Sequence, residues 1–176
     1  MAAETLDARD VTALAARAAA SGTRPVVLID GRSGAGKSTL AGELAPLLGA
    51  QLVSLDDLYP GWGGLEAGSA AVAGMVLSDR DPGWRRWDWA SGSAAEWHPL
   101  DPSLPLVVEG CGAFSRANRA RATLGVWVEL PAAERRRRAL EREPGFASHW
   151  GEWAAQERAF AAREHPRALA DVIVAG

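Results

Sequence analysis

Lysine is almost absent from this chain of 176 residues, because Lys37 is the only lysine beside eighteen arginines. Cysteine is as scarce: Cys111 stands alone, which excludes an intramolecular disulfide and favours a reducing, cytoplasmic setting. No apolar run is long enough to span a membrane, and the first residues show no signal-peptide pattern. The formal net charge of −3 offers no electrostatic support for nucleic-acid binding. We therefore expect a cytoplasmic protein that binds neither membranes nor nucleic acid.

The single lysine lies in a glycine-rich segment. Residues 31–38 read Gly-Arg-Ser-Gly-Ala-Gly-Lys-Ser, which is the G-x-x-x-x-G-K-[ST] pattern of a phosphate-binding loop. A compact ammonium fits between β- and γ-phosphate oxygens, whereas the wider guanidinium fork does not. An apolar strand is predicted before the loop, over 26–29, and after it a helix that ends within 45–49. We predict that phosphates are bound by Gly31, Ser33, Gly34, Ala35, Gly36, Lys37, Ser38 and Thr39.

The order of strands and helices predicts the fold class. Strand candidates at 26–29, 51–55, 104–109, 123–130 and 170–175 alternate with helical stretches. This alternation is typical of an α/β protein with a parallel five-stranded sheet and helices on both faces. We expect a single domain over 1–176, with a further amphipathic helix over 5–20. Residues 79–105 are rich in Trp, Pro and Gly, and predict an insertion or hairpin over the carboxyl edge of the sheet.

Three carboxylates stand at the ends of predicted strands. Asp56 and Asp57 directly follow strand 51–55, and Glu109 ends strand 104–109. One aspartate could accept the proton of an attacking hydroxyl, while the other holds a substrate hydroxyl or a metal-bound water. Capping of a helix is the simpler alternative for both. Glu109 is expected to assist Mg²⁺ beside Ser38 or to bind the substrate, and the pattern does not decide between these roles.

An arginine-rich helix is predicted after Pro131, within a lid-like segment at about 131–147. At helical spacing Arg135, Arg138 and Arg142 share one face, from which they could close over the phosphates and stabilise the transferred phosphoryl group. The alternative is a solvated basic face that pairs with neighbouring glutamates.

A tryptophan-rich stretch lies within the predicted insertion. In an extended chain Trp87 and Trp89 share one side, and Arg86 and Asp88 share the other. One side could stack on a planar ligand while the other binds hydroxyls or phosphate, although packing onto the core explains the indoles equally well. Further along, Trp150, Trp153 and Phe160 fall at helical spacing, which predicts core positions for them in preference to pocket positions.

Taken in order, these segments resemble the uridine kinase-like branch of the phosphate-loop (Walker A) kinases. The matching segments are 30–39, 54–59, the Trp-Asp-Trp of 87–89, the Glu-Gly after strand 104–109, the arginine helix and the last strand. The resemblance implies a nucleoside-kinase-like three-layer fold, with ATP and Mg²⁺ as cofactors. It also implies that Asp56 is the general base and that Tyr59 lies in the acceptor pocket.

The sequence therefore predicts an ATP-dependent kinase with an alcohol of a small molecule as acceptor, such as a nucleoside or a similar polyol. Lys37, Asp56, Arg135 and Arg138 are the predicted catalytic residues, and Arg142 joins the nucleotide site. Ser38, Glu109 and Asp56 are the predicted metal site, and the predicted acceptor residues are Asp57, Tyr59, Arg86, Trp87, Asp88 and Glu109. A nucleoside monophosphate kinase, and a phosphate-loop ATPase or switch acting on a protein partner, remain alternatives. A homodimer is compatible with the sequence.

Overall fold

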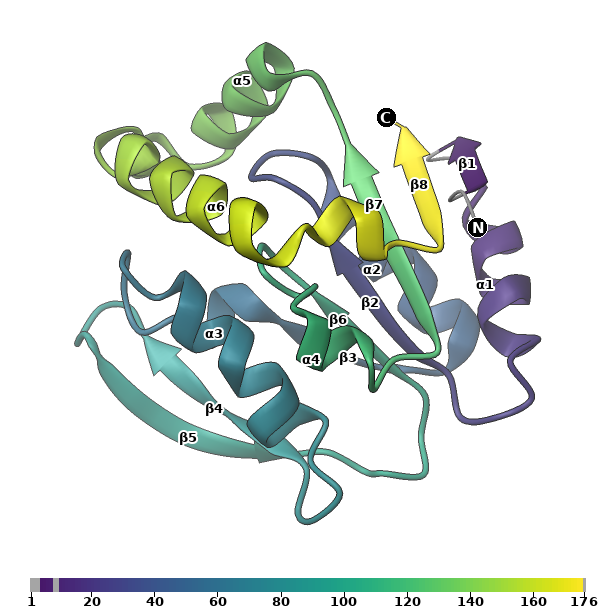
Figure 1. Ribbon diagram of the computed structural model, residues 1–176. Helices are drawn as coiled ribbons and strands as arrows, with labels where there is room; N and C mark the ends of the chain where they lie inside the picture. The colour runs from purple at the N-terminus through teal and green to yellow at the C-terminus, as the bar shows by residue number, and fades with distance from the viewer. Residues whose placement is uncertain (1–3, 8–9, 176) are drawn as a thin grey trace.

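The structure is a computed structural model that describes residues 4–7 and 10–175. Within these residues the main sheet holds six parallel strands in the order β1-β8-β7-β2-β6-β3 (Figure 1). They are β1 (Glu4–Asp7), β2 (Val26–Asp30), β3 (Gln51–Ser54), β6 (Leu106–Glu109), β7 (Leu124–Glu129) and β8 (Val172–Ala175). The five strands predicted from the sequence are all present, which confirms the parallel α/β sheet.

The sixth strand, β1, lies where the sequence predicted the start of a helix. Its backbone pairs in parallel with the outer edge of β8. Helix α1 (Val11–Ala19) begins later, because the side chain of Asp10 accepts a hydrogen bond from the backbone N of Ala13 at 3.0 Å and caps it. The prediction of a helix over 5–20 is therefore wrong for its first residues. They form a strand because they pair with the edge of β8, which lies near the C-terminus and gives no local signal in this segment.

Helices cover both faces of the sheet, as predicted (Figure 1). In this view α1 and α2 (Lys37–Leu48) lie behind the sheet, while α6 (Trp150–Glu164) crosses in front and α3 (Leu65–Ala71) packs beside it. Helix α5 (Ala132–Arg142) stands above the carboxyl edge of the strands. The short elements are η1 (Leu55–Asp57), η2 (Val72–Val76), α4 (Arg116–Arg119), η3 (Pro144–Ser148) and η4 (Pro166–Leu169). None of the helices in the described part of the chain has the length and apolar character that crossing a membrane requires.

The central strand β2 divides its side chains between two cores. Val27 and Ile29 pack with α1 and α2, whereas Val26 and Leu28 face the α6 side. This alternation follows from the two-residue period of a strand, and it explains why the run is apolar throughout.

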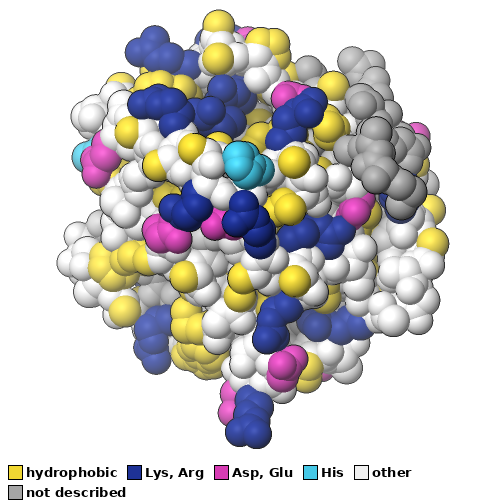
Figure 2. Space-filling view, in the orientation of Figure 1, with side chains coloured by type: hydrophobic (Ala, Val, Ile, Leu, Met, Phe, Trp, Pro, Cys, Tyr) yellow, Lys and Arg dark blue, Asp and Glu magenta, His cyan; other side chains and the backbone are white. Residues whose placement is uncertain are grey.

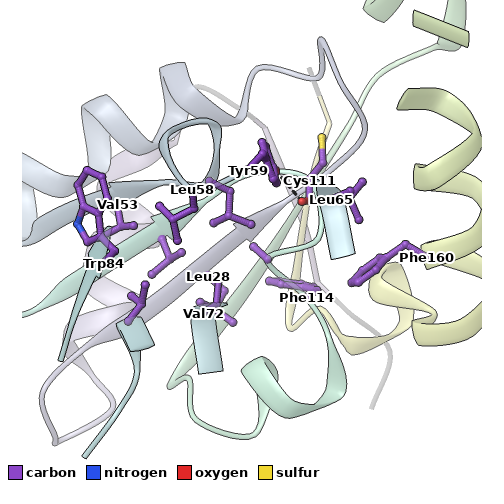
Figure 3. Packing of buried hydrophobic residues seen from close by; sticks show 14 of the residues in the cluster. Leu28, Val53, Leu58, Tyr59, Leu65, Val72, Trp84, Cys111, Phe114 and Phe160 are labelled. Carbon is purple, nitrogen blue, oxygen red and sulfur yellow. Dashed lines mark hydrogen bonds between the residues drawn. The ribbon is translucent and has the colours of Figure 1, made fainter. Parts of the chain in front are cut away.

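The front core extends from the insertion to helix α6. Figure 3 shows it running from Trp84 past Tyr59 to Phe114 and Phe160. Phe160 and Trp153 are buried in this cluster, in agreement with their helical spacing. The front core thus packs α6 against the sheet strand β2, which leads directly into the phosphate-loop pattern.

The predicted insertion over 79–105 folds as a hairpin. Its strands are β4 (Gly83–Asp88) and β5 (Ser93–Pro99), which pair antiparallel as a separate two-stranded sheet. The hairpin packs against η1 and η2. This position brings it beside the two aspartates that follow β3.

Candidate active site

The phosphate-loop pattern forms a tight turn between β2 and α2, at the carboxyl edge of the sheet. Gly36 precedes α2 with a φ of 102°, in the left-handed region that other residues disfavour. A Cβ added to Gly34 would lie 2.0 Å from the carbonyl oxygen of Arg135, so the loop and α5 are in backbone contact. Conformation and close packing therefore account for two of the glycines in the pattern.

The loop forms one wall of a cavity of about 660 Å³. The loop contributes Ser33, Gly34, Gly36, Lys37, Ser38 and Thr39 to this wall. Gly31 and Ala35 belong to the same loop but do not line the cavity. Of the other predicted site residues, the cavity is also lined by Asp56, Tyr59, Glu109, Arg138 and Arg142. Residues predicted separately as phosphate, metal and base positions thus meet in one place.

Lys37 is held at the floor of the loop with 7% of its surface exposed. Its Nζ lies 3.4 Å from the carbonyl oxygen of Arg32 and 3.4 Å from Sγ of Cys111. Burial raises the pKa of the Cys111 thiol to about 12, so the sulfur remains uncharged at neutral pH. Among the described residues no carboxylate forms an ion pair with the ammonium. The long contacts to neutral groups leave Lys37 able to exchange them for phosphate oxygens.

Glu109 ends β6 and faces the first turn of α2. Its Oε1 accepts hydrogen bonds from Ser54 Oγ at 2.6 Å and from Ser38 Oγ at 3.2 Å. Burial raises the pKa of this carboxyl, and the neighbouring Lys37 opposes that effect. Glu109 and Ser38, which the sequence predicted as parts of one metal site, are thus hydrogen-bonded to each other, and Ser54 is a further partner of Glu109 that the sequence did not single out.

The donor set around Glu109 fits a magnesium ion. Carboxylate and hydroxyl oxygens of Glu109 and Ser38 are hard ligands, and Asp56 lines the same cavity. No group of three or more His, Cys, Asp or Glu within residues 4–7 and 10–175 could hold a metal alone. Mg²⁺ is usually held by one or two side chains together with waters and substrate phosphates, so a sparse protein shell suits it.

The two aspartates after β3 are turned apart by η1. Both are exposed, but only Asp56 lines the cavity. Partial burial and the adjacent Asp56 raise the pKa of Asp57, which lies outside the cavity wall. The backbone of Asp56 is fixed by Trp89, whose Nε1 donates to its carbonyl oxygen at 2.9 Å. Asp56, which the resemblance singled out as the base, therefore lines the cavity, whereas Asp57, predicted to bind the acceptor, does not.

The end of the cavity where the acceptor is predicted to bind has an aromatic wall formed by Tyr59, Trp62, Trp89, Phe146 and Trp153. Trp62 stacks on Phe146 with ring centroids 5.3 Å apart, and its centroid lies 4.9 Å from that of Trp89. Tyr59 is buried, and its hydroxyl donates to the carbonyl oxygen of Cys111 at 2.7 Å. These rings come from the segment after η1, the hairpin, and the region from η3 to α6, so sequence spacing does not group them. Trp62 and Phe146 were not predicted as site residues.

The hairpin residues predicted to bind the acceptor lie elsewhere. Arg86 forms a two-point ion pair with Glu96 across the hairpin, with Nε–Oε1 at 2.6 Å. Asp88 accepts hydrogen bonds from Ala90 N at 3.1 Å and from Ser91 Oγ at 2.7 Å, which stabilises the hairpin turn. Neither residue lines the cavity, and nor does Trp87. A β-bulge between residues 85 and 87 interrupts the simple alternation on which that prediction relied.

The three arginines predicted on the lid face also separate. Arg138 and Arg142 line the cavity, and Arg138 is paired with Glu134 through Nε–Oε1 at 2.7 Å. Arg135 does not line it. Its Nε donates to the carbonyl oxygen of Leu130 at 3.1 Å, and its Nη1 to that of Ser33 at 3.2 Å. Arg135 therefore braces the loop from outside instead of facing the predicted phosphate site.

Asp30 is a buried carboxylate beneath the loop, and it holds the backbone there through hydrogen bonds. The sequence suggested no role for Asp30. Its Oδ1 accepts from the backbone N of Gly31 at 2.6 Å and Gly112 at 3.3 Å, and its Oδ2 from that of Phe114 at 2.8 Å. Burial raises the pKa of Asp30 to about 6, although these hydrogen bonds and Lys37 favour the charged form. Its position at a strand end, matching that of Glu109, was the available signal.

Glu157 of α6 is a second brace that sequence reasoning missed. Its Oε1 accepts from the backbone N and Oγ of Ser33 at 2.7 and 2.8 Å, and its Oε2 from Arg32 Nε at 2.7 Å. Although burial opposes the charge, the hydrogen bonds from Arg32 and Ser33 keep the pKa of Glu157 below its usual value. A glutamate in the middle of a helix, more than a hundred residues away, carries no local signal of such a contact.

Comparison with solved structures identifies the fold. The chain superposes on a "possible uridine kinase" from Bacillus stearothermophilus with a TM-score of 0.65 and 19% identity, covering 93% of this chain and 96% of the other. Shikimate kinase from Acinetobacter baumannii, in complex with shikimate, gives a TM-score of 0.53 and 19% identity over 89% and 86% of the two chains. No protein-family model and no curated protein matches the sequence. The likeness shows that this chain has the phosphate-loop kinase fold.

Proposed function

We propose that the protein is an ATP- and Mg²⁺-dependent phosphotransferase that moves the γ-phosphoryl group of ATP to an alcohol of a small molecule. The observation that carries this proposal is the shared cavity, in which Lys37, Ser38, Glu109 and Asp56 line one space of about 660 Å³. The kinase activity named for proteins of similar fold agrees with it.

The reaction needs a charge clamp and a base, and the cavity offers both. Backbone N–H groups of residues 33–39 and the Lys37 ammonium bind the phosphates, while Arg138 and Arg142 approach from the lid. Ser38 and Glu109 hold Mg²⁺, which when bound neutralises charge on the β- and γ-phosphates. Asp56 accepts the proton of the attacking hydroxyl, because it is the aspartate that lines the cavity.

For the acceptor we propose a nucleoside or another alcohol that carries a flat ring. The aromatic wall offers stacking surfaces, and Asp56 stands beside it to receive a hydroxyl. A nucleoside monophosphate is disfavoured, since its phosphate would need arginines in addition to Arg138 and Arg142, which are assigned to the phosphates of ATP. Arg86 is paired with Glu96, and Arg85 Nη1 donates to the carbonyl oxygen of Ala95 at 2.7 Å. Neither lines the cavity.

A phosphoryl-transfer screen tests the proposal. The purified protein is incubated with Mg²⁺ and either ATP or GTP, together with nucleosides, sugars or aminoglycoside-like alcohols, and products are detected by mass spectrometry. We expect ADP release to be slow alone and to rise with an acceptor that gains one phosphoryl group. ADP release that no acceptor stimulates would instead identify an ATPase or a nucleotide-dependent switch.

A further inference from the structure

A second cavity, of about 490 Å³, lies against the outer side of the phosphate loop. It is enclosed by β7, the end of α6, η4 and the first turns of α5, and it shares no lining residue with the candidate active site. Figure 2 shows basic side chains gathered around a histidine near the middle of the face that α6 and η4 cover. The charged or titratable residues that line the cavity are Arg32, Glu129, Arg135, His165 and Arg167.

Arg135 is the least compensated of these charges. Only 9% of its surface is exposed, and both of its hydrogen bonds go to backbone carbonyl oxygens. Within the described residues it forms no ion pair with a carboxylate, whereas Arg32 pairs with Glu157 and Arg167 with Glu129. Burial and the neighbouring Arg32 lower the pKa of its guanidinium, and the carboxylate of Glu157, which forms no ion pair with it, offsets them only in part. A buried charge in this position is stabilised by an anion.

Trp127 supplies an independent observation. It lines the same cavity with 7% of its surface exposed, and its Nε1 is buried without a hydrogen-bond partner. An indole N–H can only donate, and leaving it unpaired in the interior is unfavourable. The cavity therefore combines one unsatisfied indole donor with one arginine, Arg135, that has no carboxylate partner among the described residues, while Arg32 and Arg167 are each paired with a glutamate.

We propose that this second cavity binds a small molecule through an oxyanion, either a phosphate or a carboxylate group. Guanidinium forks and an indole N–H are all donors, and charge-assisted hydrogen bonds to oxyanions are the strong ones. The volume exceeds that of a lone phosphate and lies in the range of small-molecule sites. The site is distinct from the nucleotide cavity, so the proposal does not depend on the kinase activity.

The test follows the indole N–H of Trp127 by NMR in ¹⁵N-tryptophan-labelled protein, with Trp127→Phe identifying its resonance. Inorganic phosphate and malonate are titrated separately against potassium chloride of equal ionic strength. A saturating Mg²⁺ complex of a non-hydrolysable ATP analogue is present, so that phosphate does not compete for the loop. We expect a saturable shift of this resonance. A response to phosphate alone identifies a phosphate ester, and a response to malonate alone a carboxylate.

Variants of the lining arginines decide whether the anion that shifts the resonance binds in the second cavity. Arg135→Gln and Arg167→Gln should each weaken binding about tenfold, the effect of losing one charge-assisted hydrogen bond. Arg136→Gln is the matched control, because Arg136 is an exposed arginine of the same helix that lines neither cavity. If Arg135→Gln does not fold, Arg167→Gln on the surface gives the answer alone. No saturable shift with either probe, or unchanged affinity in both lining variants, would overturn the proposal.

Discussion

The two ends of the candidate active site are built in different ways. At the proposed nucleotide end, one continuous segment, 33–39, supplies six lining residues, and Glu109, Cys111, Arg138 and Arg142 complete the wall. At the acceptor end, the wall comes from the segment after η1, the hairpin tip at Trp89, and the region from η3 to α6. The nucleotide end is thus formed largely by one local turn between β2 and α2. The acceptor end forms only when segments that are far apart in the sequence pack together.

This contrast has a consequence for specificity. Side chains at the proposed acceptor end contact one another through their rings, as in the stacking of Trp62 on Phe146. The nucleotide end tolerates little change, because Gly34 has no room for a Cβ. Substitutions at the two ends should therefore have effects of different magnitude and on different kinetic parameters.

The largest effect is expected at Lys37. Lys37→Ala should reduce phosphoryl transfer by on the order of a thousandfold, since a charge that stabilises the transition state is lost. The fold should persist, because Lys37 forms only two long contacts, to Arg32 and Cys111. Initial rates with ATP and the best acceptor measure the loss, and circular dichroism checks the fold. Lys37→Arg keeps the charge and tests whether a guanidinium can replace the ammonium; near-normal rates for Lys37→Ala would refute the assignment of the loop.

The brace beneath the loop should appear as a pH dependence of stability. Asp30 has a folded-state pKa of about 6, above the ordinary 3.8, so between these values the folded protein retains a proton that the unfolded chain has lost. The free energy of unfolding should therefore fall by about 3 kcal/mol as pH rises from about 4 to about 6, and then level off.

Urea unfolding of the wild type and Asp30→Asn across this pH range isolates the contribution of Asp30. The amide resembles the protonated carboxyl, so the variant should lack this part of the pH dependence. Parallel curves for the two proteins would show that Asp30 titrates normally in the folded state.

The difference between a local turn and a wall of distant segments also explains which site residues the sequence predicts. The loop, its flanking strand and helix, and the Ser38–Glu109 contact are predicted because each depends on a local motif or on the common edge of a parallel sheet. Trp62, Phe146 and Glu157 were missed because their roles arise from contacts with segments far along the chain. Strand alternation placed Trp87 and Trp89 on one side as possible stacking surfaces, but only Trp89, which lies in the hairpin turn beyond the bulge in β4, lines the cavity.

Substitution of Asp56 and Asp57, which lie between the two ends of the site, tests the assignment of the general base. Asp56→Asn should lower kcat about a hundredfold, the loss typical of a missing general base, with little change in ATP affinity. Asp57→Asn is the matched control, because the adjacent residue is also exposed but does not line the cavity, and its effect should be small. Steady-state rates and equilibrium binding of an ATP analogue separate the two parameters. The opposite ranking would assign the base to Asp57.

The smallest effect is expected at the exposed edge of the aromatic wall, where Trp89 is 41% exposed. Trp89→Ala should raise the KM for the acceptor about tenfold and leave ATP binding unchanged, because one aromatic face is lost. Trp97→Ala is the control, since this tryptophan of the same hairpin is 39% exposed but does not line the cavity. Trp89→Phe keeps a ring but loses the hydrogen bond to Asp56, so a normal KM in that variant would assign the effect to stacking. Equal KM changes in Trp89→Ala and Trp97→Ala would instead mean that the hairpin acts only as a support, and that the acceptor does not contact the aromatic wall.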